Sequence, residues 1–156
     1  MSTNMLEQAR ELLHRHTYGV LSSHSLQLPG YPHASVMPYV IDQKGNVVIL
    51  ISRLAQHTRN VQKDGRVSLF VLEAAAPDVQ ASRRLSLACD AEQVSSEQVD
   101  AMARLYYERF PHCEGYHKQL DLEFYALKIR HVSVISGVAR VLQFEADEWG
   151  AFNASV

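Results

Sequence analysis

At 156 residues the chain has room for one domain with a sizeable core, and 47% apolar with 21% charged residues is typical of a soluble globular protein. Fifteen Lys and Arg against seventeen Asp and Glu give a net charge of −2, which favours neither nucleic acid nor an acidic membrane surface as partner. The longest apolar runs are too short to span a bilayer. We therefore expect a single domain over residues 1–156 that binds a small ligand or another protein chain.

The N-terminal segment and the cysteines indicate a cytoplasmic protein. Residues 1–16 carry charges throughout and contain no apolar signal core. Cys89 and Cys113 are far apart in the sequence, which favours reduced thiols in a cytosol-like compartment.

Hydrophobic spacing defines the elements of the first half of the chain. It predicts a helix over 3–16, a strand over 17–23, a turn-rich connector over 24–32 and two strands over 33–42 and 45–52. The last two strands are expected to form a hairpin, with Gly45 suited to a positive φ in the turn. Pro38 donates no backbone hydrogen bond, so it indicates a sheet edge or a bulge.

The second half predicts further strands in succession. The expected elements are a helix over 54–64, a strand over 66–73, a loop over 73–82, a strand over 83–94, helices over 97–110 and around 114–120, and strands over 124–136 and 137–144. Ser95 or Ser96 is expected to cap the longer helix, Pro111 to end it, and Gly137 to form the last bend. Because the strands are consecutive, the order predicts a mainly β (α+β) fold, an antiparallel barrel with peripheral helices.

Histidine patterns do not predict a metal centre. His14 and His16 are two residues apart on a helix and therefore do not face each other. His112, Cys113 and His117 have spacings that zinc can use, but no second Cys/His pair follows, so a helix-breaking turn with a buried thiol is the favoured interpretation. Phosphate-loop, nucleophile-elbow and metalloprotease motifs do not occur, and the catalytic residues stay unknown.

The connector after Ser52 is the strongest candidate binding segment. A strand that leads into a short helix presents N–H groups at the positive end of a helix dipole, which suits a phosphate. His57, Thr58 and Arg59 add hydrogen-bond donors. Arg53 adds a positive charge, and its guanidinium can donate two parallel hydrogen bonds to a phosphate. Judged by this pattern alone, an ordinary capped surface helix is favoured over a phosphate site.

Two neighbouring motifs add a family resemblance. A strand ends in Met37-Pro38-Tyr39, and the connector from Ser52 to Asn60 matches the pattern S-x-L-A-x-H-T-x-N at every specified position. Both motifs resemble the pyridoxamine 5′-phosphate oxidase-like flavoproteins, the FMN-binding split β-barrels, and within them the haem-utilisation subgroup. The resemblance extends over about residues 8–148.

This resemblance implies a homodimer of split barrels with FMN at the subunit interface. It implies that Ser35, Val36 and Met37 lie along the flavin and that Ser52, Arg53, His57 and Thr58 lie at its phosphate. FMN would then supply hydride or electron chemistry, and the chain would be an oxidoreductase acting on an unknown small molecule.

The chain also departs from the oxidase pattern. Gln56-His57 replaces an Arg-Lys pair on the connector, and Ala34 and Tyr39 replace basic residues at the ends of the preceding strand. The oxidase's substrate-binding aromatic residue and Arg have no clear counterpart, which argues against oxidation of pyridoxamine phosphate itself. Longer relatives carry a C-terminal His associated with haem ligation, whereas no His follows His131. The alternative function is a non-catalytic or haem-binding, haem-utilisation dimer.

Overall fold

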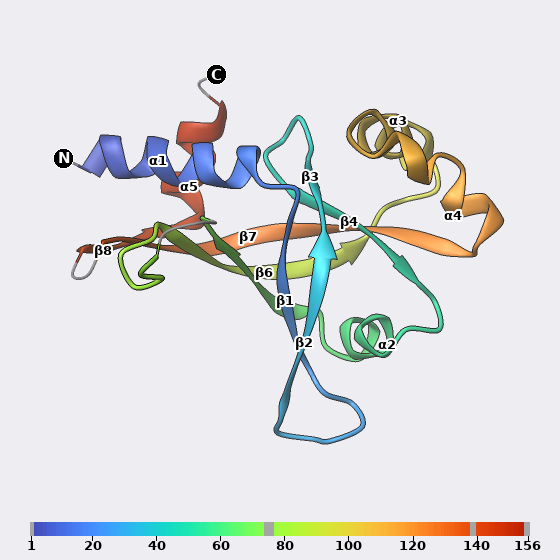
Figure 1. Ribbon diagram of the computed structural model, residues 1–156. Helices are drawn as coiled ribbons and strands as arrows, with labels where there is room; N and C mark the ends of the chain where they lie inside the picture. Colours follow the sequence, from blue (N-terminus) through green and yellow to red (C-terminus); the bar gives the residue numbers. More distant parts are fainter. Residues whose placement is uncertain (1, 74–76, 138–139, 155–156) are drawn as a thin grey trace.

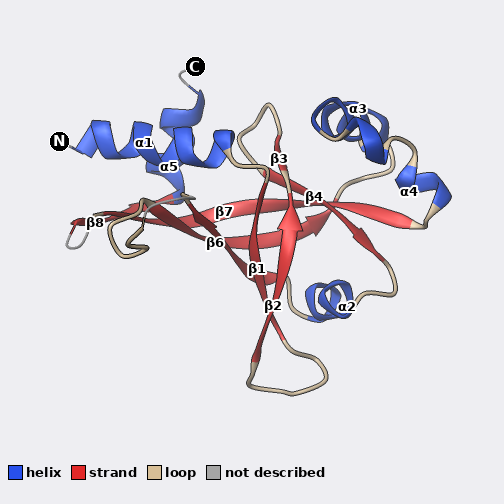
Figure 2. Cartoon of the chain, viewed as in Figure 1, coloured by secondary structure: helices blue, strands red, loops and turns tan. Residues whose placement is uncertain are grey.

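Eight strands form one antiparallel sheet in the computed structural model, which describes residues 2–73, 77–137 and 140–154 (Figures 1 and 2). They are β1 (Tyr18–His24), β2 (Pro32–Pro38), β3 (Val40–Ile41), β4 (Val47–Ser52), β5 (Arg66–Leu72), β6 (Arg84–Gln93), β7 (Leu122–Ser136) and β8 (Arg140–Glu145). Their spatial order is β2-β1-β5-β6-β7-β4-β3, with β8 also paired to β7. The curled sheet confirms the predicted α+β split-barrel class.

Strand β7 is the longest strand and pairs with three others. One of its edges pairs with β6, while the other pairs with β4 through its first half and with β8 through its second half. The register sets Ile51 opposite Glu123 and Ser52 opposite Leu122. The end of β4 is therefore held beside the beginning of β7, although the two lie far apart in the sequence.

The predicted hairpin of residues 33–42 with 45–52 is wrong in its first strand. Strand β2 pairs with β1 along its whole length, and only Val40 and Ile41 pair with β4. The chain changes partner at Tyr39, whose N–H donates to the Thr17 carbonyl and whose side chain is fully buried. Pro38 ends β2 at the edge of the sheet, where a missing N–H is tolerated.

The helices lie around the sheet rather than between its strands (Figure 1). They are α1 (Ser2–Arg15), α2 (Gln56–Lys63), α3 (Val99–Arg109), the 3₁₀ turn η1 (Pro111–Cys113), α4 (Tyr116–Gln119) and α5 (Ala146–Ala154). Helix α5 was not predicted, yet its Trp149 is buried in the core. None of the described helices is both long and apolar enough to cross a membrane.

The predictions for caps and turns are confirmed at the glycines and wrong at the start of α3. The expected cap at Ser95 or Ser96 is wrong, because the N-cap residue of α3 is Gln98, whose N–H donates to the Ser95 carbonyl in a preceding turn. Gly45 and Gly137 both have the positive φ that their turns require. The predicted loop over 73–82 and the strand over 137–144 include residues 74–76 and 138–139, which lie outside the described residues.

The core has two parts on opposite faces of the sheet. The larger part fills the curl of the barrel, where Leu21, Leu69 and Leu87 are fully buried. The smaller part lies between α3 and the β4–β7 pair and includes Val48 and Phe124. Strand β4 is therefore apolar on both faces because α3 covers the second one, so its composition does not require burial against another chain.

The C-terminal end of α1 is fixed by donors from distant elements. The Tyr39 hydroxyl donates to the Leu13 carbonyl at 2.5 Å, and Nη2 of Arg109 donates to the carbonyls of His14 and His16 at 3.0 and 2.8 Å. These donors satisfy carbonyls that have no partner within the helix.

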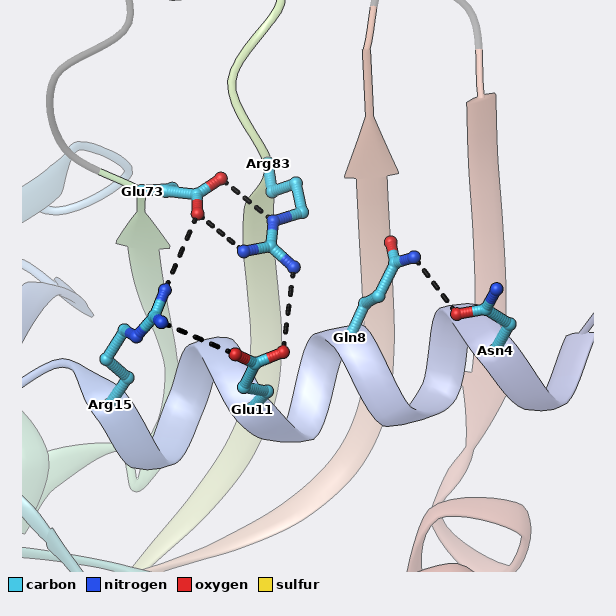
Figure 3. A network of polar contacts seen from close by, with 6 residues as sticks. All are labelled: Asn4, Gln8, Glu11, Arg15, Glu73 and Arg83. Carbon is cyan, nitrogen blue, oxygen red and sulfur yellow. Dashed lines mark hydrogen bonds and ion pairs between the residues drawn. The ribbon is translucent and has the colours of Figure 1, made fainter.

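Ion pairs join α1 to the ends of β5 and β6 (Figure 3). Arg83 donates two hydrogen bonds to Glu73 and also lies 3.9 Å from Glu11, which pairs with Arg15 as well. Glu11 and Arg15 are exposed, so their contacts add little stability, whereas the bidentate Arg83–Glu73 pair is partly buried and is the stronger part of the network.

We expect Tyr39→Phe to lower the free energy of unfolding by about 1–2 kcal/mol, because the Leu13 carbonyl loses its buried donor. Urea denaturation followed by tryptophan fluorescence measures the change. Tyr31→Phe is the matched control, since Tyr31 is 68% exposed and should leave the midpoint unchanged. Equal midpoints for the two variants would show that the hydroxyl does not hold α1.

Candidate functional site

The connector joins the end of β4 to an open helix N-terminus. Helix α2 begins at Gln56, and its N-cap residue, Ala55, makes no side-chain capping bond within the described residues. The first N–H groups of a helix have no partner inside it, so an acceptor from outside can use them. An anion at this point would also meet the positive end of the helix dipole.

The hydroxyl groups of the connector hold its shape. The Thr58 hydroxyl is fully buried and donates to the Ser52 carbonyl at 2.5 Å, while Oγ of Ser52 accepts the N–H of Leu54 at 3.2 Å. Both side chains were predicted as phosphate donors. Each makes a hydrogen bond that shapes the strand-to-helix turn. The Thr58 proton is used in that bond, whereas Ser52 only accepts there, so its hydroxyl can still donate to a ligand.

Arg53 is held by two carboxylates. Its Nε atom lies 3.2 Å from Oδ1 of Asp121 and 2.8 Å from Oε1 of Glu123. Glu123 is largely buried, and its Oε2 has no hydrogen-bond partner among the residues described. Asp121 has a φ of 56°, which a non-glycine residue seldom adopts. The guanidinium is thus oriented beside the connector, with much of its charge already offset.

These two carboxylates could not be found from the connector sequence. They stand at the start of β7 and reach Arg53 because that part of β7 pairs with the end of β4. The sequence signal is the alternation of Asp121 and Glu123 just before an apolar strand, and it names no partner. Only the pairing of the two strands identifies Arg53 as that partner.

His57 brings a neutral donor rather than a second cation. It lies half-buried in the first turn of α2, and burial lowers its pKa, with a further lowering from the neighbouring His33 of β2. At neutral pH its ring can therefore donate or accept a hydrogen bond but carries little charge.

Strand β2 presents the three predicted flavin residues in an alternating pattern. Ser35 and Met37 face inward, and Met37 is 3% exposed, whereas Val36 faces outward and is 68% exposed. The buried Oγ of Ser35 has no hydrogen-bond partner in the described part of the chain. Because β2 is an edge strand among the described strands, one side of its backbone has no strand partner there and can offer donors and acceptors.

Asn60 explains the last specified position of the connector motif. It is fully buried; its Nδ2 donates to Oγ of Ser23, and its Oδ1 accepts the N–H of Leu26. These bonds fasten α2 to β1 and to the loop that leads to β2. Sequence analysis noted the residue only as part of the motif, because its partners lie more than thirty positions away.

The outer face of β2, β1 and β5 carries an exposed apolar row. Val36 and Phe70 flank Val20 in the cross-strand register. Val20 and Phe70 are each 37% exposed. A cavity of about 430 Å³ continues this face, with Ser68 and Arg130 in its lining. The row is the kind of surface that associates with another chain.

A metal centre has no support in the described residues. They contain no group of three His, Cys, Asp or Glu side chains that could hold an ion. Nδ1 of His117 lies 2.7 Å from the Tyr107 hydroxyl, a contact between neutral groups of α3 and α4.

Comparison with known proteins finds relatives whose names refer to haem. The chain is 27% identical over 151 residues to the chloroplast heme oxygenase HOZ of Arabidopsis thaliana, which covers 94% of this chain and 46% of that protein. The chain thus spans about half the length of that relative. A heme binding protein from Mycobacterium smegmatis is 25% identical, with a TM-score of 0.84 over 94% of this chain and 60% of that one.

Further solved structures share the fold. The protein Atu2129 of Agrobacterium tumefaciens, of unknown function, is 26% identical with a TM-score of 0.77, covering 85% of this chain and 56% of that one. HutZ of Vibrio cholerae has a TM-score of 0.64 at 22% identity, over 90% of each chain.

Residues 5–150 match the family model described as pyridoxamine 5′-phosphate oxidase. The match covers nearly the whole chain, including strand β2 and the connector. The chain belongs to the pyridoxamine 5′-phosphate oxidase family.

Proposed function

We propose that the chain is an FMN-binding flavoprotein that acts as an oxidoreductase on a small molecule, with FMN at the interface of a homodimer. The flavin ring would lie along Ser35, Val36 and Met37, and the phosphate beside Ser52, Arg53, His57 and Thr58. Bound FMN supplies the electron or hydride chemistry, while the protein positions it and tunes its surroundings.

The observation that carries this proposal is the packing of an open helix N-terminus next to an edge strand. Helix α2 packs against β2, and His33 of β2 is close enough to influence the pKa of His57. A phosphate can accept hydrogen bonds from the first turn of α2 while the ring meets free backbone groups of β2. Ser35 adds a hydroxyl that still lacks a partner within the described residues.

The protein groups divide this work unequally. Backbone N–H groups and His57 provide hydrogen bonds, and Arg53 provides the charge. Thr58 acts mainly by holding the turn, because its hydroxyl already donates to the backbone, whereas the Ser52 hydroxyl only accepts there and can also donate to the phosphate. The phosphate must share Arg53 with Asp121 and Glu123, which also limits how many negative charges the site can hold.

We expect Arg53→Ala to weaken FMN binding by about 1.5–3 kcal/mol, the scale of a charge-assisted hydrogen bond. The substitution also leaves two carboxylates without their cation beside the phosphate. Riboflavin, which lacks the phosphate, should bind the wild type much more weakly than FMN and lose little on the same change. Titrations followed by flavin fluorescence quenching compare both ligands on both proteins.

Arg104→Ala is the control for this comparison. Arg104 is an exposed arginine on α3, so this substitution removes one positive charge at a position away from the connector. It should leave FMN affinity unchanged. Equal affinity of the wild type for FMN and riboflavin would contradict phosphate recognition at the connector.

The dimer predicts a second measurable effect. Val36→Lys introduces a charge at the β2 end of the exposed apolar row, where Val36 is its most exposed member, and should convert a micromolar dimer into a monomer in light scattering, because charges are disfavoured in the core of an interface. Val79→Lys is the matched control, since Val79 is similarly exposed but lies in a loop. A wild-type protein that is already monomeric would exclude this interface and the shared FMN site.

Haem is the second candidate ligand. It is favoured by the similarity to the heme binding protein of Mycobacterium smegmatis and to the heme oxygenase HOZ. An absorbance spectrum of the purified protein, taken before and after addition of FMN or haemin, separates the two ligands. We expect flavin bands that sharpen on binding; a Soret band that titrates to one haem per chain without any FMN binding would favour haem.

A further inference from the structure

We propose that the cavity between the β3–β4 turn and helix α3 is a second binding site, which takes a small organic carboxylate with an apolar body. It is built from elements other than the connector and the edge strand β2. The turn and the helix stand on the same upper side of the molecule in Figure 1. The inference does not depend on which cofactor binds at the connector.

The cavity has a volume of about 220 Å³ and an apolar floor. Val94, Met102 and Leu105 are partly buried residues that pack against the smaller core, and Ala126 of β7 lines the cavity with them. The alanine side chains at positions 101 and 126 leave this space unfilled. A cavity of this size accepts a ligand with one ring or a short branched chain, and the apolar floor favours a ligand whose body is apolar.

The wall opposite α3 is a rigid turn. Oδ1 of Asp42 accepts the backbone N–H groups of Lys44 and Asn46, each at 2.9 Å, and its Oδ2 accepts the side-chain amide of Asn46 at 3.2 Å. Gly45 supplies the positive φ of 83° that this turn needs. The turn thus forms its own hydrogen bonds, and the wall is in place before a ligand arrives.

Two lysines give the cavity its charge preference. Lys44 and Lys128 line it, and neither ammonium group has a hydrogen bond or ion pair within the described residues. Lys128 is half-buried on β7, and its cross-strand neighbour Asp90 is already paired with Arg130 at 2.6 Å. Asp42 lines the same cavity, but its oxygens are engaged by the turn.

A carboxylate is the ligand chemistry that these groups favour. A half-buried ammonium without a counter-ion is unfavourable, and a bound carboxylate would supply the missing negative charge. The cavity also borders the first turn of α3, at Ala101, where the helix dipole favours an anion. Asp100 lies in the same first turn, and together with Asp42 it disfavours ligands with several negative charges.

Benzoate is a suitable probe, and benzyl alcohol is its uncharged counterpart. Methyl NMR spectra recorded during titration should show benzoate shifting the signals of Ala101, Met102, Leu105 and Ala126. Lys128→Met keeps most of the side-chain volume but removes the charge, so it should weaken benzoate about tenfold and leave benzyl alcohol unchanged. Ala101→Leu should fill the cavity and abolish the shifts from both compounds.

Lys118→Met is the matched control, since it removes a lysine charge from α4, outside this cavity. It should leave benzoate binding unchanged. Absence of benzoate shifts at these methyl groups would overturn the proposal. So would benzoate binding that Lys128→Met leaves intact, because the lysine would then not recognise the acid. Unfolding midpoints of the three variants should match the wild type, so that a lost signal reports the site.

Discussion

The split barrel depends on the change of strand partner at Tyr39, where the chain passes from one end of the sheet to the other. Its N–H bonds to the carbonyl that precedes β1, and its hydroxyl reaches the last turn of α1. One residue therefore joins the helix, the edge strand β2 and the short strand β3. A continuous hairpin would have paired β2 with β4 and left no edge strand beside α2. Because Pro38 cannot donate to such a pairing, the chain adopts the curl instead.

The polar side chains of the connector mainly fix the position of the connector in the fold. Thr58 and Asn60 are buried and bond to the end of β4 and to β1, so they determine where α2 begins and how it lies. The backbone N–H groups of the first turn then become the principal open donors. Arg53 is shared with two acids, and His57 is largely neutral at pH 7 because burial lowers its pKa. An anion at this point would be recognised by oriented dipoles and one partly neutralised cation, which makes binding sensitive to small changes in geometry.

The two faces of the sheet are covered unequally. Helix α3 protects the outside of β4 and β7, whereas the outside of β2, β1 and β5 keeps an exposed row around Val20. Burial of that row by another chain would complete a second layer for this half of the sheet. The helix that protects the other half does not fill its space at Ala101 and Ala126, and this incomplete packing leaves the cavity beside Lys128.

The sequence alone predicts the strands and helices with a strong hydrophobic period, the order that excludes a doubly wound sheet, and the connector motif that indicates the family. The elements and the motif are local, because each lies within a window of about ten to twenty residues, and the order follows from reading them along the chain. Long-range packing sets which strand pairs with β2, places Trp149 in the core and brings Asp121 and Glu123 to Arg53. Tertiary packing also sets that Ser35 faces inward and Val36 outward, because strand alternation alone leaves open which of the two neighbours is buried. These outcomes depend on the register of strands that are distant in the sequence, and a shift of one residue would reverse every inward and outward side chain.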